Sequence, residues 1–391
     1  MFNWQLINDS VTDSDKKALV DFINTPNQRF TNGPKVREFE KAWSEYVGCK
    51  YSVFVNSGAS ANYIMASIMK EEKGLGEVIV SPLGWVSDVA PLVNLGFTPV
   101  FVDVSMENMS ITLDNIKAAV TDKTVGISLV HVLGFAAAAD EMTQFCEDNN
   151  LFFIEDCCES HGATYKGTKV GNFGDVSNFS FYFGHHITTI EGGMVCTNDE
   201  RFYDYAKLFR SHGMTREAST QVQEQYERSR PDLNPLFTFA VPGYNMRNQE
   251  FNAVLGLEQL KRLDYNCDKR RDNFKIWVDS LDSDKFFVDF HQNGNSNFAL
   301  PLILRKKDLE LFKKCCILLE EQEVEFRIGT AGGGNQARQP YLEKYDFVEH
   351  NLHNVNHIHD YGLYIGNHPE LDKKEILNLT NKLNGVVYAS R

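Results

Sequence analysis

The chain has 391 residues, which is too many for one ordinary core, so two lobes are expected. Its 42% hydrophobic and 24% charged residues indicate a globular protein. The 39 Lys and Arg against 53 Asp and Glu give a net charge of −14, which argues against nucleic acid or an anionic membrane surface as a partner. An anionic ligand would therefore need donors placed locally.

The N-terminus and the cysteines predict a cytoplasmic protein. The opening MFNWQLINDSVTDSD lacks the charged and apolar regions of a signal peptide, and no apolar run is long enough to cross a bilayer. The eight cysteines include no CxxC motif, so neither a zinc site nor an iron–sulfur cluster is indicated. We expect reduced thiols and no bound metal.

Short β-like runs alternate with helical patterns in the first half of the chain. This alternation predicts an α/β fold around a largely parallel sheet, in which ligands bind at the carboxyl ends of the strands. Strands are expected at 51–55, 77–81, 100–104, 125–131, 151–155, 180–183 and 193–197, and helices at 59–70 and 113–120.

The second half is expected to complete a second lobe. Residues 214–240 are polar without a sustained period and are interpreted as an excursion, whereas 250–277 is expected to be one long helix. We divide the chain into a large domain, 1–265, and a small C-terminal α/β domain, 266–391. The glycine run at 331–335 lacks the ending of a phosphate-binding P-loop, so we expect a flexible loop there.

Three features follow predicted strands, and each has a plain alternative. NSGASAN (56–62) opens a helix whose free backbone N–H groups could hold a phosphate, although Ser-Gly at a helix start is often only a cap. Asp156 ends an apolar strand, where a carboxylate needs either a cationic partner or a turn to cap. Trp85 could cover a planar ring or could simply pack.

FYFGHHITTIEGG (181–193) contains two adjacent histidines. Neighbouring residues on a strand point to opposite faces, so a zinc-binding pair is unfavourable. We expect one histidine to face a site and the other to face away. His186 is interpreted as the structural one.

Taken together and in this order, these features resemble the DegT/DnrJ/EryC1 family of sugar aminotransferases. The likeness runs from RFTNGPKVREFEKAWSEYVG (29–48), through NSGASAN and EDCCESHGA (155–163), to VPGYNMRNQEFNAVLGLEQLKRL (241–263). It implies the pyridoxal-phosphate-dependent type I fold of aspartate aminotransferase, with the cofactor in the large domain.

The resemblance also implies which residues contact pyridoxal 5'-phosphate. Gly58, Ala59 and Ser180 would hold the phosphate. Trp85 would stack on the pyridine ring, and Asp156 would pair with its nitrogen and keep it protonated.

Two further contacts are implied less directly. Glu159 would lie close to the cofactor, with a plain surface carboxylate as the alternative. Asn245 would reach the cofactor phosphate of a neighbouring subunit, which implies a homodimer with shared active sites.

The chain departs from the family pattern at one position. The family lysine that forms the Schiff base stands six residues before the Glu of the glycine turn. Here His185 stands six residues before Glu191, and no lysine occurs from Gly171 to Ala206. Imidazole cannot form that bond, but it can carry a proton near neutral pH. We therefore expect His185 to be the catalytic base.

This departure resembles the 3-dehydratase members of the family, which use pyridoxamine 5'-phosphate. It implies that the C3 hydroxyl of a nucleotide-linked 4-keto-6-deoxyhexose, GDP-linked by expectation, is removed with release of ammonia. L-Glutamate would be the amino donor, and the pathway would be deoxysugar (colitose-type) biosynthesis for lipopolysaccharide O-antigen. His212 and Arg216 would lie near the sugar. His212 could instead be a loop residue without a role, and Arg247 is as readily an interface residue as a ligand contact.

Two alternatives stay open at this point. A nucleotide-sugar aminotransferase would need a Schiff-base lysine from elsewhere in the chain, and a non-catalytic sensor would have kept the fold without the lysine. The presence of Asp156, Ser180 and Trp85 argues against the sensor. Dehydratases that act on a CDP-sugar carry a 2Fe–2S cluster on spaced cysteines that include a Cys-x-Cys step, and this chain has no such step. Which nucleotide, and which hexose or heptose, also stays open.

Overall fold

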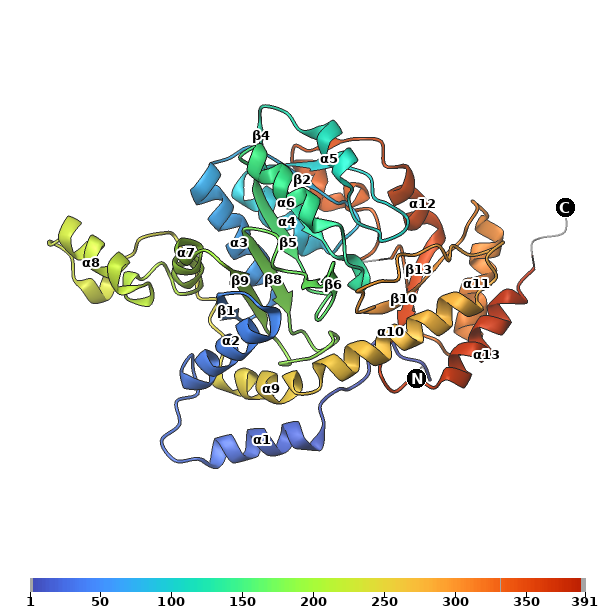
Figure 1. Ribbon diagram of the computed structural model, residues 1–391, viewed down its shortest axis with the longest axis horizontal. Helices are drawn as coiled ribbons and strands as arrows, with labels where there is room; N and C mark the ends of the chain where they lie inside the picture. Colours follow the sequence, from blue (N-terminus) through green and yellow to red (C-terminus); the bar gives the residue numbers. More distant parts are fainter. Residues whose placement is uncertain (1–2, 331, 388–391) are drawn as a thin grey trace.

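The centre of the computed structural model, which describes residues 3–330 and 332–387, is a sheet of eight strands in the order β1-β9-β8-β5-β4-β2-β3-β12 (Figure 1). Neighbouring strands from β8 to β12 run parallel, whereas β9 pairs antiparallel with both β1 and β8. The expected α/β fold with a largely parallel sheet is confirmed. The strands are β1 (Tyr51–Val55), β2 (Glu77–Val80), β3 (Thr98–Phe101), β4 (Thr124–Val130), β5 (Phe152–Asp156), β8 (Val176–Ser180), β9 (Gly193–Thr197) and β12 (Val348–Glu349).

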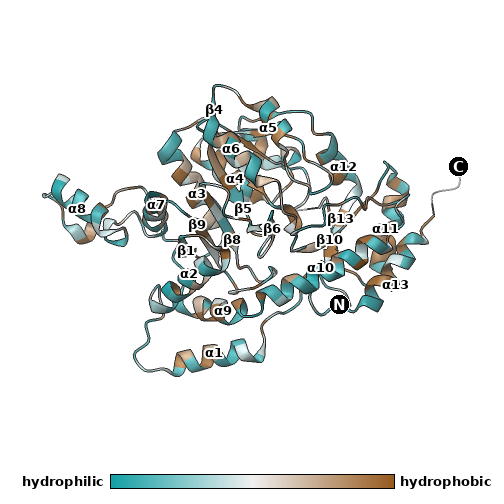
Figure 2. Cartoon of the chain, viewed as in Figure 1, coloured by the Kyte–Doolittle hydropathy of each residue, from teal (hydrophilic) through white to brown (hydrophobic). Residues whose placement is uncertain are grey.

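Helices cover both faces of this sheet. Along β1, Val53 and Val55 join one hydrophobic core and Phe54 joins the other, as the alternation of side chains along a strand requires. Figure 2 shows apolar residues gathered at the central strands and polar ones on outward helices such as α10. The helices of this part are α1 (Asp13–Asn24), α2 (Pro34–Val47), α3 (Gly58–Lys73), α4 (Val86–Leu95), α5 (Leu113–Ala119), α6 (Ala139–Asp148), α7 (Glu200–Arg210), α8 (Thr220–Ser229) and α9 (Glu250–Leu260).

A smaller lobe contains the three-stranded antiparallel sheet β10-β13-β11. Two segments link the lobes: the Trp4 indole donates to the carbonyl of Gly366 at 2.8 Å, and β12 returns to pair with β3. The division at residue 265 stays a prediction. The elements of the smaller lobe are β10 (Ala299–Ile303), β11 (Phe326–Ile328), β13 (Gly362–Gly366), α10 (Leu263–Ser280), α11 (Leu309–Glu321), α12 (His353–Tyr361) and α13 (Lys373–Asn384). A hairpin of β6 (Thr164–Tyr165) and β7 (Thr168–Lys169) lies between β5 and β8 in the sequence.

The expectation of one helix over 250–277 is wrong, because α9 ends at Leu260 and α10 begins at Leu263. Arg262 leaves the helical conformation at φ −116° and ψ 5°. Its guanidinium binds both carboxylate oxygens of the buried Asp15 on α1, at 3.0 and 2.5 Å. Pairing of this buried acid accompanies the break in the helix.

The expected strand at 180–183 is also wrong, since β8 ends at Ser180. Its polar members Ser177 and Asn178 are fully buried and hydrogen-bonded, so the strand lacks the apolar signature used to find it. The chain then turns, and the two histidines lie in that turn.

Residues 214–240 form the excursion that was expected, and within it α8 was not foreseen. This helix has no buried residue, and it projects from the body of the molecule (left in Figure 1). No helix in residues 3–330 and 332–387 has both the length and the apolar character needed to cross a membrane.

Candidate active site

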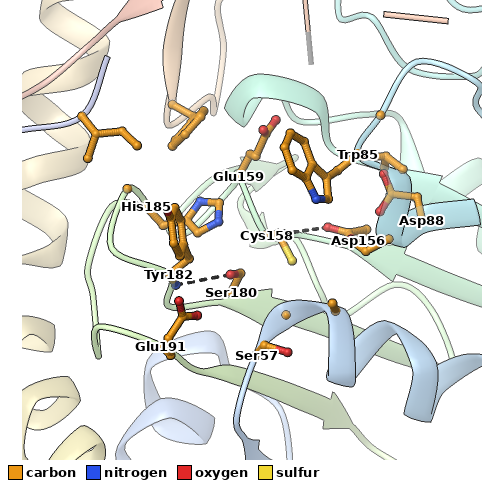
Figure 3. Close-up of a pocket in the computed structure, with 18 of the residues that line it drawn as sticks. Ser57, Trp85, Asp88, Asp156, Cys158, Glu159, Ser180, Tyr182, His185 and Glu191 are labelled. Carbon is orange, nitrogen blue, oxygen red and sulfur yellow. Dashed lines mark hydrogen bonds between the residues drawn. The ribbon is translucent and has the colours of Figure 1, made fainter. Parts of the chain in front are cut away.

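A cavity of about 450 Å³ lies at the carboxyl ends of the central strands (Figure 3). Its walls come from the turns after β1, β2, β5 and β8, where a parallel α/β sheet places its ligands. The smaller lobe contributes Phe298, Arg327 and Tyr364, and Ile7 of the N-terminal segment closes one side.

The first turn of α3 forms one end of the cavity. The Ser57 hydroxyl caps the helix by accepting from the N–H of Ser60 at 3.0 Å, and the N–H of Ala61 bonds to the Ser57 carbonyl. The N–H groups of Gly58 and Ala59 have no acceptor among the described residues, which suits a phosphate at the positive end of the helix. The Ser180 hydroxyl faces the same turn, and a Cβ added at Gly58 would lie 2.7 Å from the Cβ of Ser180.

Asp156 lies at the end of β5 and is 4% exposed. Three N–H donors hold its carboxylate: the side-chain amides of Asn62 (2.7 Å) and Asn178 (3.2 Å) on Oδ2, and the backbone of Cys158 (2.9 Å) on Oδ1. In the described part of the chain no lysine or arginine pairs with it. The carboxylate is therefore placed to meet a cation supplied by a ligand.

Trp85 lies at the N-terminus of α4, over the same hollow (Figure 3). Its side chain is 53% exposed, which is high for an indole inside a cavity. A planar ligand lying between the indole and Asp156 would cover it.

His185 lines the cavity and His186 does not. His186 is buried, and its Nε2 lies 3.1 Å from the carbonyl oxygen of Ser296. The expected division into one histidine at the site and one away from it holds in this geometry, but its cause is a turn rather than strand alternation.

The His185 imidazole lies among aromatic rings, with its centroid 5.3 Å from that of Phe298 and 6.3 Å from that of Tyr182. Burial lowers the pKa of His185 to about 4, and the Asp156 carboxylate opposes that shift. The ring is therefore neutral at pH 7 and can accept a proton.

Glu159 also lines the cavity, and its Oε2 accepts from the backbone N–H of Leu133 at 2.7 Å. Burial raises the pKa of Glu159 to about 7. A carboxyl with this pKa can hold or release a proton near neutral pH.

Three residues expected to contact cofactor or sugar lie outside this chain's cavity, and one of them, Asn245, was expected to reach the cofactor of a neighbouring subunit. Asn245, His212 and Arg216 are exposed and are not part of the cavity wall. The backbone of Asn245 pairs with Ser211, so Asn245 and His212 belong to one surface strip at the base of the projecting excursion. Their roles stay predictions.

The structure brings several groups to the site that the sequence did not single out. Asn62 and Asn178 hold Asp156, Asp88 lies beside it, and Arg327 and Tyr364 arrive from the smaller lobe. Asn62 could have been found, because it lies one helical turn after the Gly58 turn in NSGASAN. The others depend on contacts between segments far apart in the sequence.

These residues fit pyridoxal phosphate. The cavity offers unpaired N–H groups for a phosphate, an exposed indole for a ring face and a buried carboxylate without a cation for a ring nitrogen. Such a pocket on such a sheet defines the class of pyridoxal-phosphate-dependent enzymes with the type I aminotransferase fold.

The comparisons with known proteins identify the family. Residues 11–384 match the DegT/DnrJ/EryC1/StrS aminotransferase family, and the chain belongs to it. GDP-4-keto-6-deoxy-D-mannose 3-dehydratase of Yersinia pseudotuberculosis is 33% identical over 395 residues, covering 98% of both chains. GDP-perosamine synthase of Escherichia coli O157:H7 is 32% identical over 268 residues, 68% of each chain.

Solved structures agree with this family. The E. coli GDP-4-keto-6-deoxy-D-mannose 3-dehydratase with bound hydrated PLP is 30% identical and has a TM-score of 0.88, with 98% of this chain and 100% of that chain covered. A structure of GDP-4-keto-6-deoxymannose 3-dehydratase with a trapped PLP–glutamate geminal diamine has a TM-score of 0.89 at 30% identity, covering 97% and 100%. The expected fold and family are confirmed.

Proposed function

We propose that this protein is a pyridoxamine-phosphate-dependent 3-dehydratase of a GDP-linked 4-keto-6-deoxyhexose. The reaction removes the C3 hydroxyl and yields a 3-deoxy-4-keto sugar and ammonia. Full-length relatives with this activity in their names support the assignment. The likeness to GDP-perosamine synthase, another relative that handles a GDP-sugar, supports the GDP part.

The observation that carries the proposal is His185 in the cavity wall at the family's lysine position. No lysine is among the described residues that line the cavity. A chain with this pocket and no amine in it can carry protons but cannot hold the cofactor covalently. This favours dehydration over the aminotransferase alternative.

When bound, pyridoxamine phosphate supplies an amine for the sugar's keto group and a ring that withdraws electrons. Gly58, Ala59 and Ser180 would hold its phosphate, Asp156 would pair with its ring nitrogen and Trp85 would cover its ring. Together these contacts would hold the cofactor in the cavity whose wall includes His185.

His185 moves the proton. Its Nδ1 is buried without a hydrogen-bond partner among the described residues, which leaves Nε2 as the working nitrogen. The neutral ring would accept a proton at cofactor C4′ and, once protonated, would donate it to the leaving C3 hydroxyl, which departs as water. The aromatic wall of Phe298 and Tyr182 keeps water from the ring during this transfer.

L-Glutamate is proposed as the amino donor that restores the cofactor, and Arg327 is proposed to bind one of its carboxylates. Arg327 reaches the cavity from β11, and its Nη1 lies 3.4 Å from the Tyr364 hydroxyl. Its guanidinium forms no ion pair within residues 3–330 and 332–387. A free guanidinium in a cavity suits a carboxylate.

We propose a homodimer in which Asn245, His212 and Arg216 complete the partner's site. Large apolar side chains lie exposed on this strip and on the adjoining excursion, where an interface would cover them. They are Leu236 (58% exposed), Phe237 (60%), Phe239 (57%) and Tyr244 (58%). The eight cysteines are free, in keeping with a reducing compartment such as the cytoplasm.

The test is product analysis with a panel of GDP-, CDP-, UDP- and dTDP-linked 4-keto sugars, pyridoxamine phosphate and L-glutamate. We expect ammonia release and a product lacking the C3 hydroxyl with the GDP-linked hexose. Formation of a 4-amino sugar without ammonia would contradict the proposal.

A further inference from the structure

Asp88 is a second buried carboxyl group next to Asp156. It lies in the first turn of α4, is 7% exposed and lines the same cavity. One amide links the two acids, because Asn62 Nδ2 lies 2.7 Å from Asp156 Oδ2 and 3.4 Å from Asp88 Oδ1 (Figure 3 shows the two carboxyl groups). Oδ2 of Asp88 comes within 2.4 Å of a Cβ built at Gly84, so only glycine leaves room for it.

The two acids are held differently. Asp156 accepts three hydrogen bonds from N–H donors. Asp88 has the long contact with Asn62 and the backbone N–H of Trp85, which is a weaker set of donors. Burial, and after it the neighbouring Asp156 carboxylate, raises the pKa of Asp88 well above its usual range.

Charge balance also favours a protonated Asp88 beside an ionised carboxylate. In the described part of the chain no lysine or arginine pairs with either acid, and a protonated ring nitrogen brings one positive charge. Two ionised carboxylates would leave an uncompensated buried charge, whereas one acid and one carboxylate match the ligand. Neighbouring buried carboxyl groups share a proton in other enzymes for the same reason.

We propose that Asp88 is a positioning residue for the cofactor: its protonated carboxyl donates a hydrogen bond to the Asp156 carboxylate and fixes the oxygen that faces the ring nitrogen. This role rests on the proposed cofactor site and not on the sugar chemistry. The titratable groups that face Asp88 are Asp156 at the end of β5, Cys158 and Glu159 after it, and Tyr341 of the smaller lobe. None of these is a cation.

The test uses the protein loaded with pyridoxamine phosphate, without sugar, so failure of the dehydratase reaction would not alter its result. Infrared difference spectroscopy at pH 8.5 looks for a protonated carboxyl band. At that pH Glu159, whose pKa is raised to about 7, is mostly ionised and adds little to the band. We expect the band in the wild type and in Glu159→Gln, and its loss in Asp88→Asn.

The affinity for pyridoxamine phosphate shows whether position 88 acts as a hydrogen-bond donor or as a negative charge. Asp88→Asn keeps an N–H donor toward Asp156, so its dissociation constant for pyridoxamine phosphate should stay within about threefold of wild type. Asp88→Ala removes the donor and should raise that constant about tenfold. Absence of the band in the wild-type protein, or equal affinity of the Asn and Ala variants, would overturn the proposal. Absence of the band in the wild-type protein decides against the proposal even where a variant does not fold.

Discussion

Adjacent histidines at positions 185 and 186 have different environments although their side chains are the same. The turn after β8 directs one imidazole into the cavity and the other against the carbonyl of Ser296. The sequence predicted this division, because the spacing from Glu191 singles out His185. The partners of Asp156 were not foreseen, since Asn178 and Asp88 are close to it only after β2, β4, β5 and β8 have paired.

Glu159 provides a pH test at the scale of one residue. Its pKa is raised from 4.5 to about 7, so the folded state binds its proton more tightly than the unfolded chain does. Its contribution to stability is present below about pH 4.5 and is lost as the pH rises to 7. Glu159→Gln should therefore become more stable than wild type by up to about 3 kcal/mol between pH 5 and 8, measured by urea unfolding.

The comparison with wild type is necessary because His185 works in the opposite direction. Its pKa is lowered from 6.5 to about 4, so its contribution to stability is lost as the pH falls through that range. That effect is common to both proteins and cancels in their difference. Parallel stability curves for the two proteins would contradict the buried position of Glu159.

At the scale of elements, strands and helices with strong patterns were predicted and those shaped by polar contacts were not. β1, β9 and α3 lie where expected, because apolar periodicity alone determines them. The break between α9 and α10 depends on Arg262 and a buried acid on α1, which no local pattern shows. The small-lobe groups at the site were missed because β11 reaches the cavity only through the lobe arrangement.

The two ends of α3 allow a matched pair of glycine variants. Gly58→Ala places a Cβ 2.7 Å from that of Ser180, so the helix start or the end of β8 must move. Because the start of α3 and the end of β8 are both proposed to hold the phosphate, affinity for pyridoxamine phosphate should fall at least tenfold in a fluorescence titration.

Gly74→Ala is the control at the other end of the same helix. Gly74 has φ +73° and no neighbouring atom within 4 Å, so the substitution strains only the backbone. It should lower stability by about 1 kcal/mol and leave cofactor affinity unchanged. An equal loss of affinity in both variants would argue against a phosphate site at the start of α3.

At the scale of the whole molecule, we propose that each complete site needs residues from two chains. Mixed dimers of His185→Asn and Asn245→Asp, each inactive alone, should regain activity. One of the two sites then combines a wild-type His185 with the partner's wild-type asparagine.

Mixed dimers of His185→Asn and Gly58→Val are the control. Residues 185 and 58 both line the cavity of their own chain, so each subunit of this dimer carries one damaged cavity. No intact site can form from that pair, so no activity should return. Equal recovery in the two mixtures, or none in either, would contradict shared sites. Ammonia release is the readout in both mixtures.

The central claim is that His185 replaces the lysine that would bind the cofactor, and borohydride reduction tests it most directly. Protein mixed with pyridoxal phosphate is reduced and its peptides are analysed by mass spectrometry, with His185→Lys as the positive control. We predict no reduced cofactor adduct on any cavity residue of the wild-type chain and an adduct at position 185 of the variant. A stoichiometric adduct on a lysine of the wild-type protein would contradict the claim.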